Sequence, residues 1–309
     1  MKKIVLLSLL VMRLCVISAA EQEDKDKDEV ANLGLNFGQL AIELDKQIVQ
    51  EQVIVDGNQQ IAISSIAMYN STFNIESSRG NNSFQIIFNF ATPVTLTVVF
   101  TDGYYSASDM NNYVQQAMIT AGYYATNASS QNVYWFEMVI NPVYYAIEVN
   151  LYPIPTQAQA TALGLTPAVG SSWSWPVTAS VPQLVTLNNT WPDLIGFAKS
   201  TTFPVATQTT EISYNSSKTP IISPVNAYII RCNLINSPFS NPFDLMYALP
   251  INAVYGGLIT NSSNSLIWND IAPNTYSNLI LTFYDQLLNP LKLHDMDCVI
   301  SVVIRNKNE

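Results

Sequence analysis

The feature that most constrains the fold of this chain is an alternation of apolar and polar residues that recurs along its length. Residues 84–90 alternate in this way, and so do residues 94–100, 143–151 and 298–304. Successive side chains of a β-strand point to opposite faces, so a period of two is typical of strands buried on one face. Turn-forming Asn, Ser and Pro residues separate these runs. The pattern predicts an all-β protein, a sandwich or jelly roll of roughly eight to ten strands.

Residues 61–75, with the sequence IAISSIAMYNSTFNI, predict a further strand with one irregularity. The apolar positions shift phase by one residue between Ile63 and Ile66. A strand that carries one extra residue forms a β-bulge, so we expect a bulge at Ser64 and Ser65.

One segment, residues 108–122, has helical spacing instead. Apolar residues recur every three or four positions from Met110 to Ala121. Ser108 is the expected N-cap, with Asp109 in the first turn, and Gly122 is the expected end of the helix. We predict one crossover helix between two strands. Strands and helices do not alternate elsewhere, which argues against a parallel-sheet enzyme fold.

The 309 residues, of which 48% are hydrophobic, suffice for one large domain, which we place at residues 46–309. Within it, residues 153–224 are rich in Pro, Ser, Thr and Trp and show weak periodicity. They predict a long loop or a small projecting insertion. Its tryptophans either pin the loop to the body or form a sugar-binding platform, and we favour the first; they are Trp173, Trp175 and Trp191.

The first 45 residues have a different composition. Residues 1–20 carry two lysines directly after Met1, continue with an apolar run and end in small residues, which is the pattern of a secretory signal. Arg13 interrupts the run, which is also short for a membrane span. Three interpretations of residues 1–20 fit this pattern. The segment is a cleaved signal, a hydrophobic arm packed under a neighbour or against a membrane, or the result of a misplaced start codon. Residues 21–45 predict a charged, solvated linker.

The charge of the chain limits its partners. The net charge is −10, charged residues make up 12% of the sequence, about half the usual share, and Lys and Arg form no cluster. Nucleic-acid binding requires several cations on one face, so we expect no direct nucleic-acid contact. A surface of Asn, Ser, Thr and Gln suits contact with other proteins, because few charges lose their hydration there. A neutral surface that simply follows from the biased composition fits equally well.

Cysteines and glycosylation triplets give little information. Cys15 lies in the apolar start, and Cys232 and Cys298 fall on the apolar faces of predicted strands, where two buried thiols or one bridge would fit. Six Asn-x-Ser/Thr triplets are present, but the abundance of these residues accounts for that number. They begin at Asn70, Asn81, Asn127, Asn188, Asn215 and Asn261.

The only histidine, His294, would have to serve any Ser-His-Asp or Cys-His mechanism. It lies in a predicted turn, LKLHDMDC, where Asp295 and Asp297 could join it around a metal ion. Three such residues in one turn are a weak metal signal, and we expect a solvated turn histidine.

Two carboxylates and one pair of glycines also do not indicate a catalytic or phosphate-binding site. Glu137 and Glu148 lie on neighbouring predicted strands, and nothing in the sequence places them across a cleft as a glycosidase pair. Gly256 and Gly257 lack the partner residues of a phosphate loop. We therefore predict no catalytic residue, no metal ligand and no cofactor, and hence no enzyme.

Five segments, which follow one another in order between residues 61 and 305, resemble the penton-type minor capsid proteins of virophages, Polinton-like viruses and related large DNA viruses. The similar features are the Tyr69–Ser71 turn, the Gly103–Tyr105 turn before a helix, Leu194, Gly196 and Phe197, and the Asp285–Pro290 turn. Ile195 stands where leucine is usual. The segments are IAISSIAMYNSTFNI, TDGYYSASDMNNYVQQAM, WPDLIGF, SPVNAYIIRCNLI and LILTFYDQLLNPLKL.

This resemblance implies a single jelly roll that forms five-fold capsomers at the vertices of a virion. It implies a homopentamer that contacts a neighbouring major capsid protein, with receptor or host-membrane contact open, and no catalytic residues. The signal-like start at residues 1–20 departs from the pattern of the family. The alternative is a secreted β-sandwich binding module, lectin-like, derived from a capsid gene.

Overall fold

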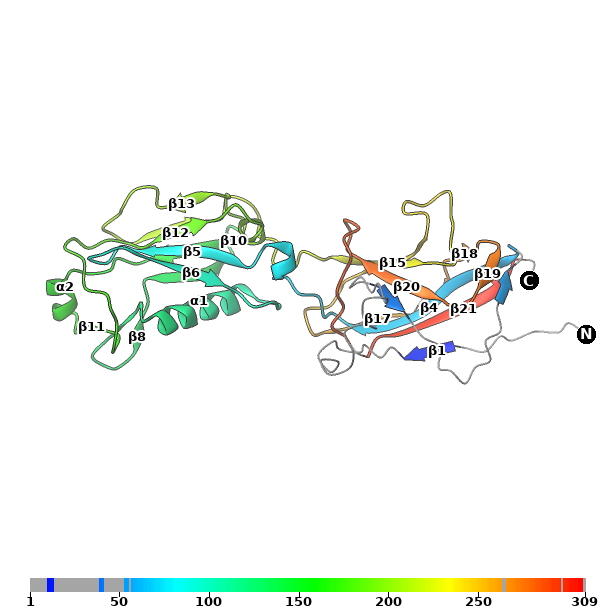
Figure 1. Ribbon diagram of the computed structural model, residues 1–309, viewed down its shortest axis with the longest axis horizontal. Coiled ribbons are helices and arrows are strands. Elements are labelled where there is room, and N and C mark those ends of the chain that lie inside the picture. The colour runs from blue at the N-terminus through cyan, green and yellow to red at the C-terminus, as the bar shows by residue number, and fades with distance from the viewer. Residues whose placement is uncertain are drawn as a thin grey trace, which may run out of the picture. The chain divides into compact units, whose positions relative to one another are not determined.

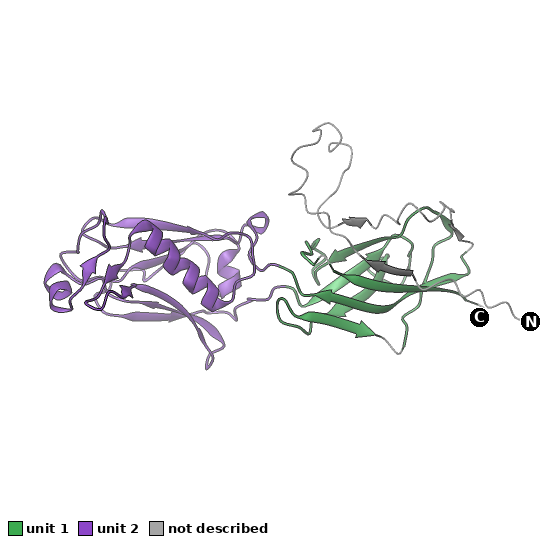
Figure 2. Ribbon diagram, turned by 90° about the horizontal axis from the view of Figure 1, so that it is seen from below, with its two compact units in different colours: residues 1–72, 225–309 green, residues 73–224 purple. Residues whose placement is uncertain are grey.

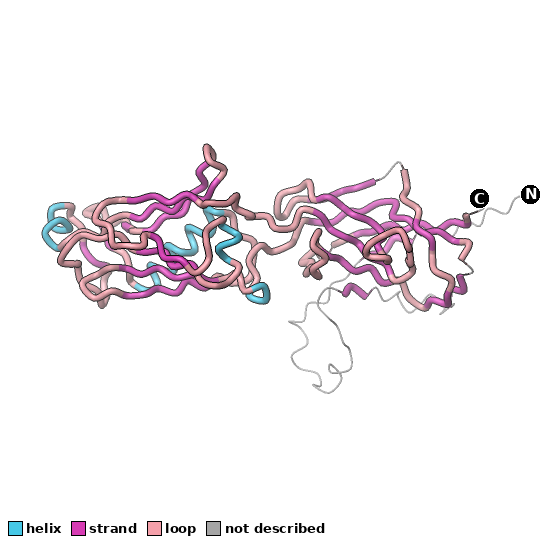
Figure 3. The backbone as a smooth tube through the Cα atoms, turned by 90° about the horizontal axis from the view of Figure 1, so that it is seen from above, coloured by secondary structure: helices cyan, strands magenta, loops and turns pink. Residues whose placement is uncertain are grey.

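The computed structural model describes residues 10–13, 39–41, 53–55, 57–262, 265–295 and 297–307. These residues form mainly β-strands with few helices, and every pairing between the described strands is antiparallel (Figures 1 and 3). The predicted all-β class is confirmed. Most of the predicted segments 1–20 and 21–45, with Cys15, lie outside the described residues.

The chain divides into two compact units (Figure 2). Unit 1 combines residues 1–72 with residues 225–309, and unit 2 consists of residues 73–224. This division differs from the predicted single domain at residues 46–309. Each unit buries a hydrophobic core of its own.

Unit 1 is a sandwich of two antiparallel sheets. Its core consists of residues from both sheets, such as Ile66, Tyr228 and Phe283. The first sheet has the order β1 (Leu10–Arg13), β21 (Val299–Asn306), β4 (Gln59–Tyr69) and β17 (Leu258–Ser262), and β18 (Asn269–Asp270) also pairs with β4. The second has the order β16 (Leu245–Pro250), β15 (Ala227–Cys232), β20 (Ile280–Tyr284) and β2 (Gln39–Ala41). Strands β3 (Val53–Val55) and β19 (Asn274–Tyr276) form a separate pair.

The bulge predicted in β4 is confirmed. Ser301 of β21 lies opposite Ser65, whereas Val302 lies opposite Ile63, so Ser64 is the extra residue. The bulge lets apolar residues on both sides of Ser64 face the same core, since Ile63 and Ile66 are both buried.

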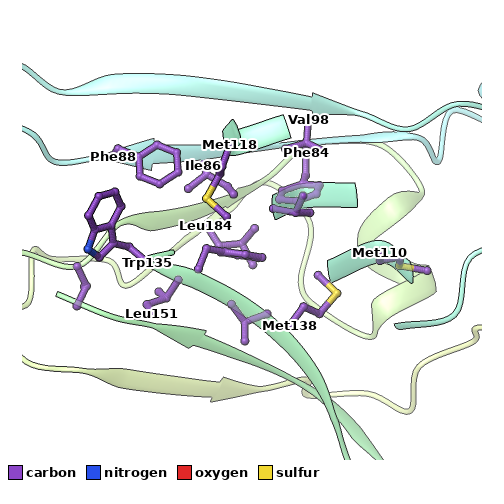
Figure 4. Close-up of a cluster of buried hydrophobic side chains, with 14 of the residues drawn as sticks. Phe84, Ile86, Phe88, Val98, Met110, Met118, Trp135, Met138, Leu151 and Leu184 are labelled. Carbon is purple, nitrogen blue, oxygen red and sulfur yellow. The ribbon is translucent and has the colours of Figure 1, made fainter. Parts of the chain in front are cut away.

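Unit 2 also contains facing sheets, with the described helices beside them. The side chains of β5, β9, β10 and β12 meet in a common core (Figure 4). The first sheet has the order β13 (Thr201–Phe203), β12 (Gln183–Thr186), β5 (Ser83–Phe88) and β6 (Val94–Val99). The second sheet has the order β14 (Ile212–Asn215), β10 (Ala146–Leu151) and β9 (Phe136–Asn141). The third, smaller sheet has the order β11 (Thr166–Pro167), β7 (Ala125–Thr126) and β8 (Asn132–Val133). The helices are α1 (Ala107–Ala121), α2 (Gln157–Ala162), α3 (Trp191–Ile195) and the short 3-10 helix η3 (Ser77–Arg79).

Helix α1 is the predicted crossover helix, but it begins earlier than the sequence suggested. Its N-cap is Ser106, not Ser108: the Ser106 Oγ accepts a hydrogen bond from the Asp109 N–H at 3.1 Å. The Asp109 carboxylate in turn accepts from the Ser106 N–H at 3.0 Å, which completes a capping box. The predicted end is confirmed, since Gly122 is the C-cap with φ of 71°.

Residues 153–224 differ from the predicted long loop or insertion. They supply α2, α3 and β11 to β14, and they form a large part of the unit 2 core. Trp173, Trp175 and Trp191 are buried in that core, which confirms that they pin the segment to the body. Because their rings are buried, they do not form a platform for a sugar. The strands here are two to four residues long, too short for an alternating pattern to stand out.

The strand predicted from Val143 starts three residues later, at Ala146. The residues before it form the tight turn between β9 and β10, where Tyr145 has a positive φ of 50°. The alternation at Val143 and Tyr145 therefore belongs to a turn that exposes its apolar side chains.

Candidate assembly surfaces

His294 is an exposed residue on the connection between β20 and β21. Its backbone N–H donates to the Ser71 Oγ at 3.0 Å. The neighbouring Asp295 is buried, and its carboxylate accepts hydrogen bonds from the backbone N–H groups of Tyr69 at 2.6 Å and Asp297 at 2.8 Å. In the described part of the chain, His, Cys, Asp and Glu side chains form no group of three that could hold a metal ion. Asp295 thus serves to tie the connection to the end of β4.

The structure places Glu137 and Glu148 on the same face of the β9–β10 pair, an arrangement that no sequence pattern indicates. Glu137 lies opposite Asn150, and Glu148 lies two residues further along, opposite Val139. The Glu148 carboxylate accepts from the Asn141 Nδ2 at 2.6 Å.

The Glu137 carboxylate accepts a hydrogen bond from the Tyr152 hydroxyl at 2.7 Å. Burial and this hydrogen bond raise the pKa of Tyr152 to about 12. A general acid works best with a pKa near the working pH, so this phenol is poorly suited to donate a proton at neutral pH. The contact holds the edge of the sheet together.

The two cysteines in the described residues are free and buried, which confirms the predicted buried thiols. Burial raises the pKa of Cys232 to about 11 and that of Cys298 to about 12, with the Asp295 charge adding to the rise at Cys298. Nucleophilic thiols need a lowered pKa, so neither residue has the character of a catalytic cysteine.

The Tyr-Asn-Ser turn that follows β4 is held by Asn70. The Asn70 Oδ1 accepts from the hydroxyls of Tyr228 at 3.1 Å and Thr72 at 3.2 Å, and its Nδ2 donates to the Ala253 carbonyl at 3.0 Å. Asn70 and Asn81 are both buried, so two of the six glycosylation triplets are inaccessible in the folded protein.

Two other motif residues also serve the fold. Asp285 is buried, and its Oδ1 accepts from the backbone N–H groups of Leu287 and Asn289, both at 2.8 Å. Gly196 has φ of 78°, and a Cβ at this position would lie 2.1 Å from the Lys218 carbonyl oxygen. The segments that carry the family resemblance therefore shape turns and close contacts.

The turn between β9 and β10 presents the first of two exposed apolar surfaces, the hairpin patch. Its side chains are exposed by 61, 82, 70 and 73%; they are Ile140, Val143, Tyr144 and Tyr145. The Asn141 Oδ1 accepts from the backbone N–H of Val143 at 3.1 Å, and its Nδ2 also contacts the Asn215 Oδ1 at 3.2 Å. The patch is thus displayed on a turn that its own strands hold in place.

Unit 1 carries the second surface, the turn patch, at the junction of β4 and β17. Leu258 pairs with Tyr69 across the two strands, and the preceding turn exposes Val254. The Gly256 N–H donates to the Asn70 carbonyl at 2.8 Å, which fixes this turn against β4. Exposed apolar patches are typical of surfaces that contact other proteins.

No helix within the described ranges has both the length and the apolar character needed to cross a membrane.

Comparison with known proteins gives structural matches only. No protein-family model matches the chain, and no curated protein does. The chain is similar to the mavirus penton protein, with 12% identity over 83% of this chain and 88% of that one and a TM-score of 0.40. It is also similar to a chain of the Sputnik virophage structure, with 9% identity over 97% of this chain and 98% of that one and a TM-score of 0.37.

Proposed function

We propose that this chain is a structural capsid subunit of the penton type. It assembles as a homopentamer at the five-fold vertices of an icosahedral DNA virus capsid and packs there against the major capsid protein. The observation that carries this proposal is the exposed apolar surface of both units, the hairpin patch and the turn patch, on a chain with only 12% charged residues.

A surface of this kind gains free energy when another protein covers it. Burial of apolar area contributes roughly 25 cal/mol per Å², and tyrosine is enriched where proteins meet. Tyr144 and Tyr145 follow each other in the sequence of the hairpin patch and are both exposed, so two large rings can enter a neighbouring subunit with little loss of side-chain freedom. Few charges would have to lose their hydration in the process.

The ionisable groups with perturbed pKa values support a structural role over an enzymatic one. Cys232, Cys298 and Tyr228 belong to the core of unit 1, and the pKa of Tyr228 rises to about 12 because it is buried. Arg231 and Asp270, the perturbed charged groups, are each paired with a side chain of opposite charge. These groups hold strands together.

The test is the oligomeric state of the purified full chain, measured by multi-angle light scattering at several salt concentrations. We expect a discrete oligomer with the mass of a pentamer. The double variant V143S/Y144S should lower the oligomeric fraction strongly, because it removes the two central side chains of the hairpin patch. V177S removes another exposed valine outside both patches and is the matched control.

A stable monomer at all protein and salt concentrations would contradict the capsid proposal. Full assembly of V143S/Y144S would contradict the role of the hairpin patch while leaving the oligomer intact.

A further inference from the structure

The apolar start of the chain, predicted as a signal or a hydrophobic arm, supplies an edge strand to unit 1. Strand β1 pairs antiparallel with β21, with Leu10 opposite Val302 and Arg13 opposite Val299 (Figure 1). Strand β2 does the same in the other sheet, where it pairs with β20 through Leu40 opposite Leu281. The N-terminal segment thus adds one strand to each sheet of the sandwich.

These two strands cover edges that would otherwise be open. In the described sheets, β21 pairs with β4 on one side and with β1 on the other, and β20 lies between β15 and β2. An open edge presents a row of unpaired N–H and C=O groups, which readily pair with a strand of another chain. Strand β21 has eight residues, so its open edge would be long.

The connections to β1 and β2 are much longer than adjacent strands need. Twenty-five residues, 14–38, separate β1 from β2, and eleven residues, 42–52, separate β2 from β3. Connections between neighbouring elements usually take about four to six residues. Twenty-five residues can span up to about 80 to 90 Å when extended. This tether is long enough for β1 to reach β21 of an adjacent molecule.

We propose that β1 is an exchange strand, which pairs with β21 of a second copy in the assembled protein. The inference rests on the proposed function, since it requires an oligomer. A strand supplied by a neighbour makes the same backbone hydrogen bonds as one supplied by its own chain, so exchange costs little once the copies are close together. In a ring, each copy donates one strand and accepts one, and this head-to-tail relation closes the symmetry.

Cysteine cross-linking tests the exchange directly, because Val11 lies opposite Ser301 in the β1–β21 register. Directly opposed residues of antiparallel strands have Cα atoms about 4.5 to 5.5 Å apart, within the range that a disulfide bridges. The full chain would be prepared with C15S and either V11C or S301C, and the mass of each sample would verify that residues 1–20 are present. The two preparations are then mixed, allowed to assemble and oxidised.

We expect a covalent dimer on a non-reducing gel of the mixed sample. The matched control replaces S301C by S262C, which lies on β17 at the opposite edge of the same sheet and should give no dimer. A chain carrying both V11C and S301C should give a ladder of covalent oligomers.

A doubly substituted chain that closes only an internal disulfide would overturn the inference, because β1 would then pair within its own molecule. Absence of any cross-link, or removal of residues 1–20 from the mature protein, would overturn it as well. Light scattering on the same samples separates the two proposals: an oligomer without cross-links between chains leaves the proposed function standing, whereas a monomer contradicts both.

Discussion

At the scale of single residues, Asn74 connects three segments of unit 2. This fully buried side chain donates from its Nδ2 to the carbonyls of Tyr105 at 2.8 Å and Ile222 at 2.9 Å, and its Oδ1 accepts from the Tyr105 N–H at 2.8 Å. Each buried group left without its partner costs about 1–3 kcal/mol. Asn74 therefore holds the beginning and the end of unit 2 against each other.

We expect N74A to lower the free energy of unfolding by about 3 kcal/mol, since three partly buried backbone groups lose their partner. Urea unfolding followed by circular dichroism measures this change. N188A removes an exposed asparagine of the same unit and should stay within about 0.5 kcal/mol of the wild type. Equal effects of the two substitutions would contradict the role given to Asn74.

Gly80 and Gly196 both have a positive φ, but only Gly196 lacks space for a side chain. Comparing alanine variants at the two positions therefore distinguishes the cost of backbone strain from the cost of a steric collision. Gly80 has φ of 62° and nothing within 4 Å of the position that a Cβ would take, whereas the Cβ of an alanine at Gly196 would collide with the Lys218 backbone. We expect G80A to cost about 1 kcal/mol, the usual penalty of left-handed backbone for an L-residue. G196A should cost several times more or prevent folding. Thermal unfolding of both variants is the measurement, and similar melting temperatures would refute the steric argument.

The buried thiols make the stability of unit 1 sensitive to alkaline pH. The pKa of Cys232 rises from an ordinary value of 9.0 to about 11, and that of Cys298 to about 12, chiefly because both are buried. Above about pH 9 the unfolded chain loses these thiol protons while the folded chain keeps them. The stability linked to these groups is therefore complete below pH 9 and is lost as the pH rises toward the folded values.

The double variant C232A/C298A tests this linkage. We expect its free energy of unfolding to fall less than that of the wild type between pH 8 and pH 10.5, even if the variant is less stable at pH 8. Tyr228 is present in both proteins and accounts for part of the remaining pH dependence. Parallel pH profiles would show that the two thiols do not titrate in this way.

At the scale of secondary-structure elements, the sequence predicts those strands and helices that are determined by a local pattern of residues. Strands β5, β6 and β21 show clear alternation over six to eight residues, and the bulge at Ser64 appears as a shift of phase. The end of α1 at Gly122 was predicted correctly, but its N-cap was not: Ser108 was expected, whereas Ser106 forms the capping box with Asp109 three residues later.

Other elements depend on partners that are distant in the sequence. Strand β12 has four residues and pairs with β5, about a hundred residues earlier in the chain. A run of four residues spans two periods of alternation at most, so its pattern cannot be told from chance. The placement of Glu137 and Glu148 on one face of the sheet depends on the β9–β10 register, which the turn at residues 142–145 sets and the sequence alone does not show.

Helix α1 closes one side of unit 2 by contact with two edge strands. The Asn111 Oδ1 accepts from the Met138 N–H of β9 at 2.9 Å, and the Tyr113 hydroxyl donates to the Val99 carbonyl of β6 at 2.7 Å. The helix thus satisfies backbone groups at the edges of both sheets, which protects them from pairing with other chains.

We expect N111A to lower the free energy of unfolding by about 1–2 kcal/mol and to increase aggregation on heating, because the Met138 N–H loses its acceptor. Asn112 is the adjacent residue, is exposed and has the same side chain, so N112A is a matched control for helix propensity. Chemical denaturation and light scattering during a thermal ramp measure the two effects. If N111A and N112A behaved alike, the hydrogen bond from the Met138 N–H to Asn111 would not stabilise the edge of β9.

At the scale of the whole molecule, the division into two units was not predictable from local pattern. Unit 1 joins the two ends of the chain, and unit 2 is inserted between β4 and β15. The first boundary falls between Thr72 and Phe73, inside the segment IAISSIAMYNSTFNI, where no change of composition marks it. Long-range pairings, such as those of β4 with β21 and with β17, reveal that the start and the end of the body share one sandwich.

The insertion has its entry and exit close together, since the Asn74 side chain contacts the Ile222 carbonyl. Each unit also has a separate core, so the contacts that stabilise one are internal to it. We therefore expect residues 73–224, expressed alone, to unfold cooperatively in urea with the far-UV spectrum of a β-protein. The chain in which a short Gly/Ser linker replaces residues 73–224 should do the same, because a few residues can join its two ends. Gradual, non-cooperative unfolding of either fragment would show that the two cores depend on each other, and the sandwich of unit 1 could then not present its edges and its turn patch as an independent assembly module.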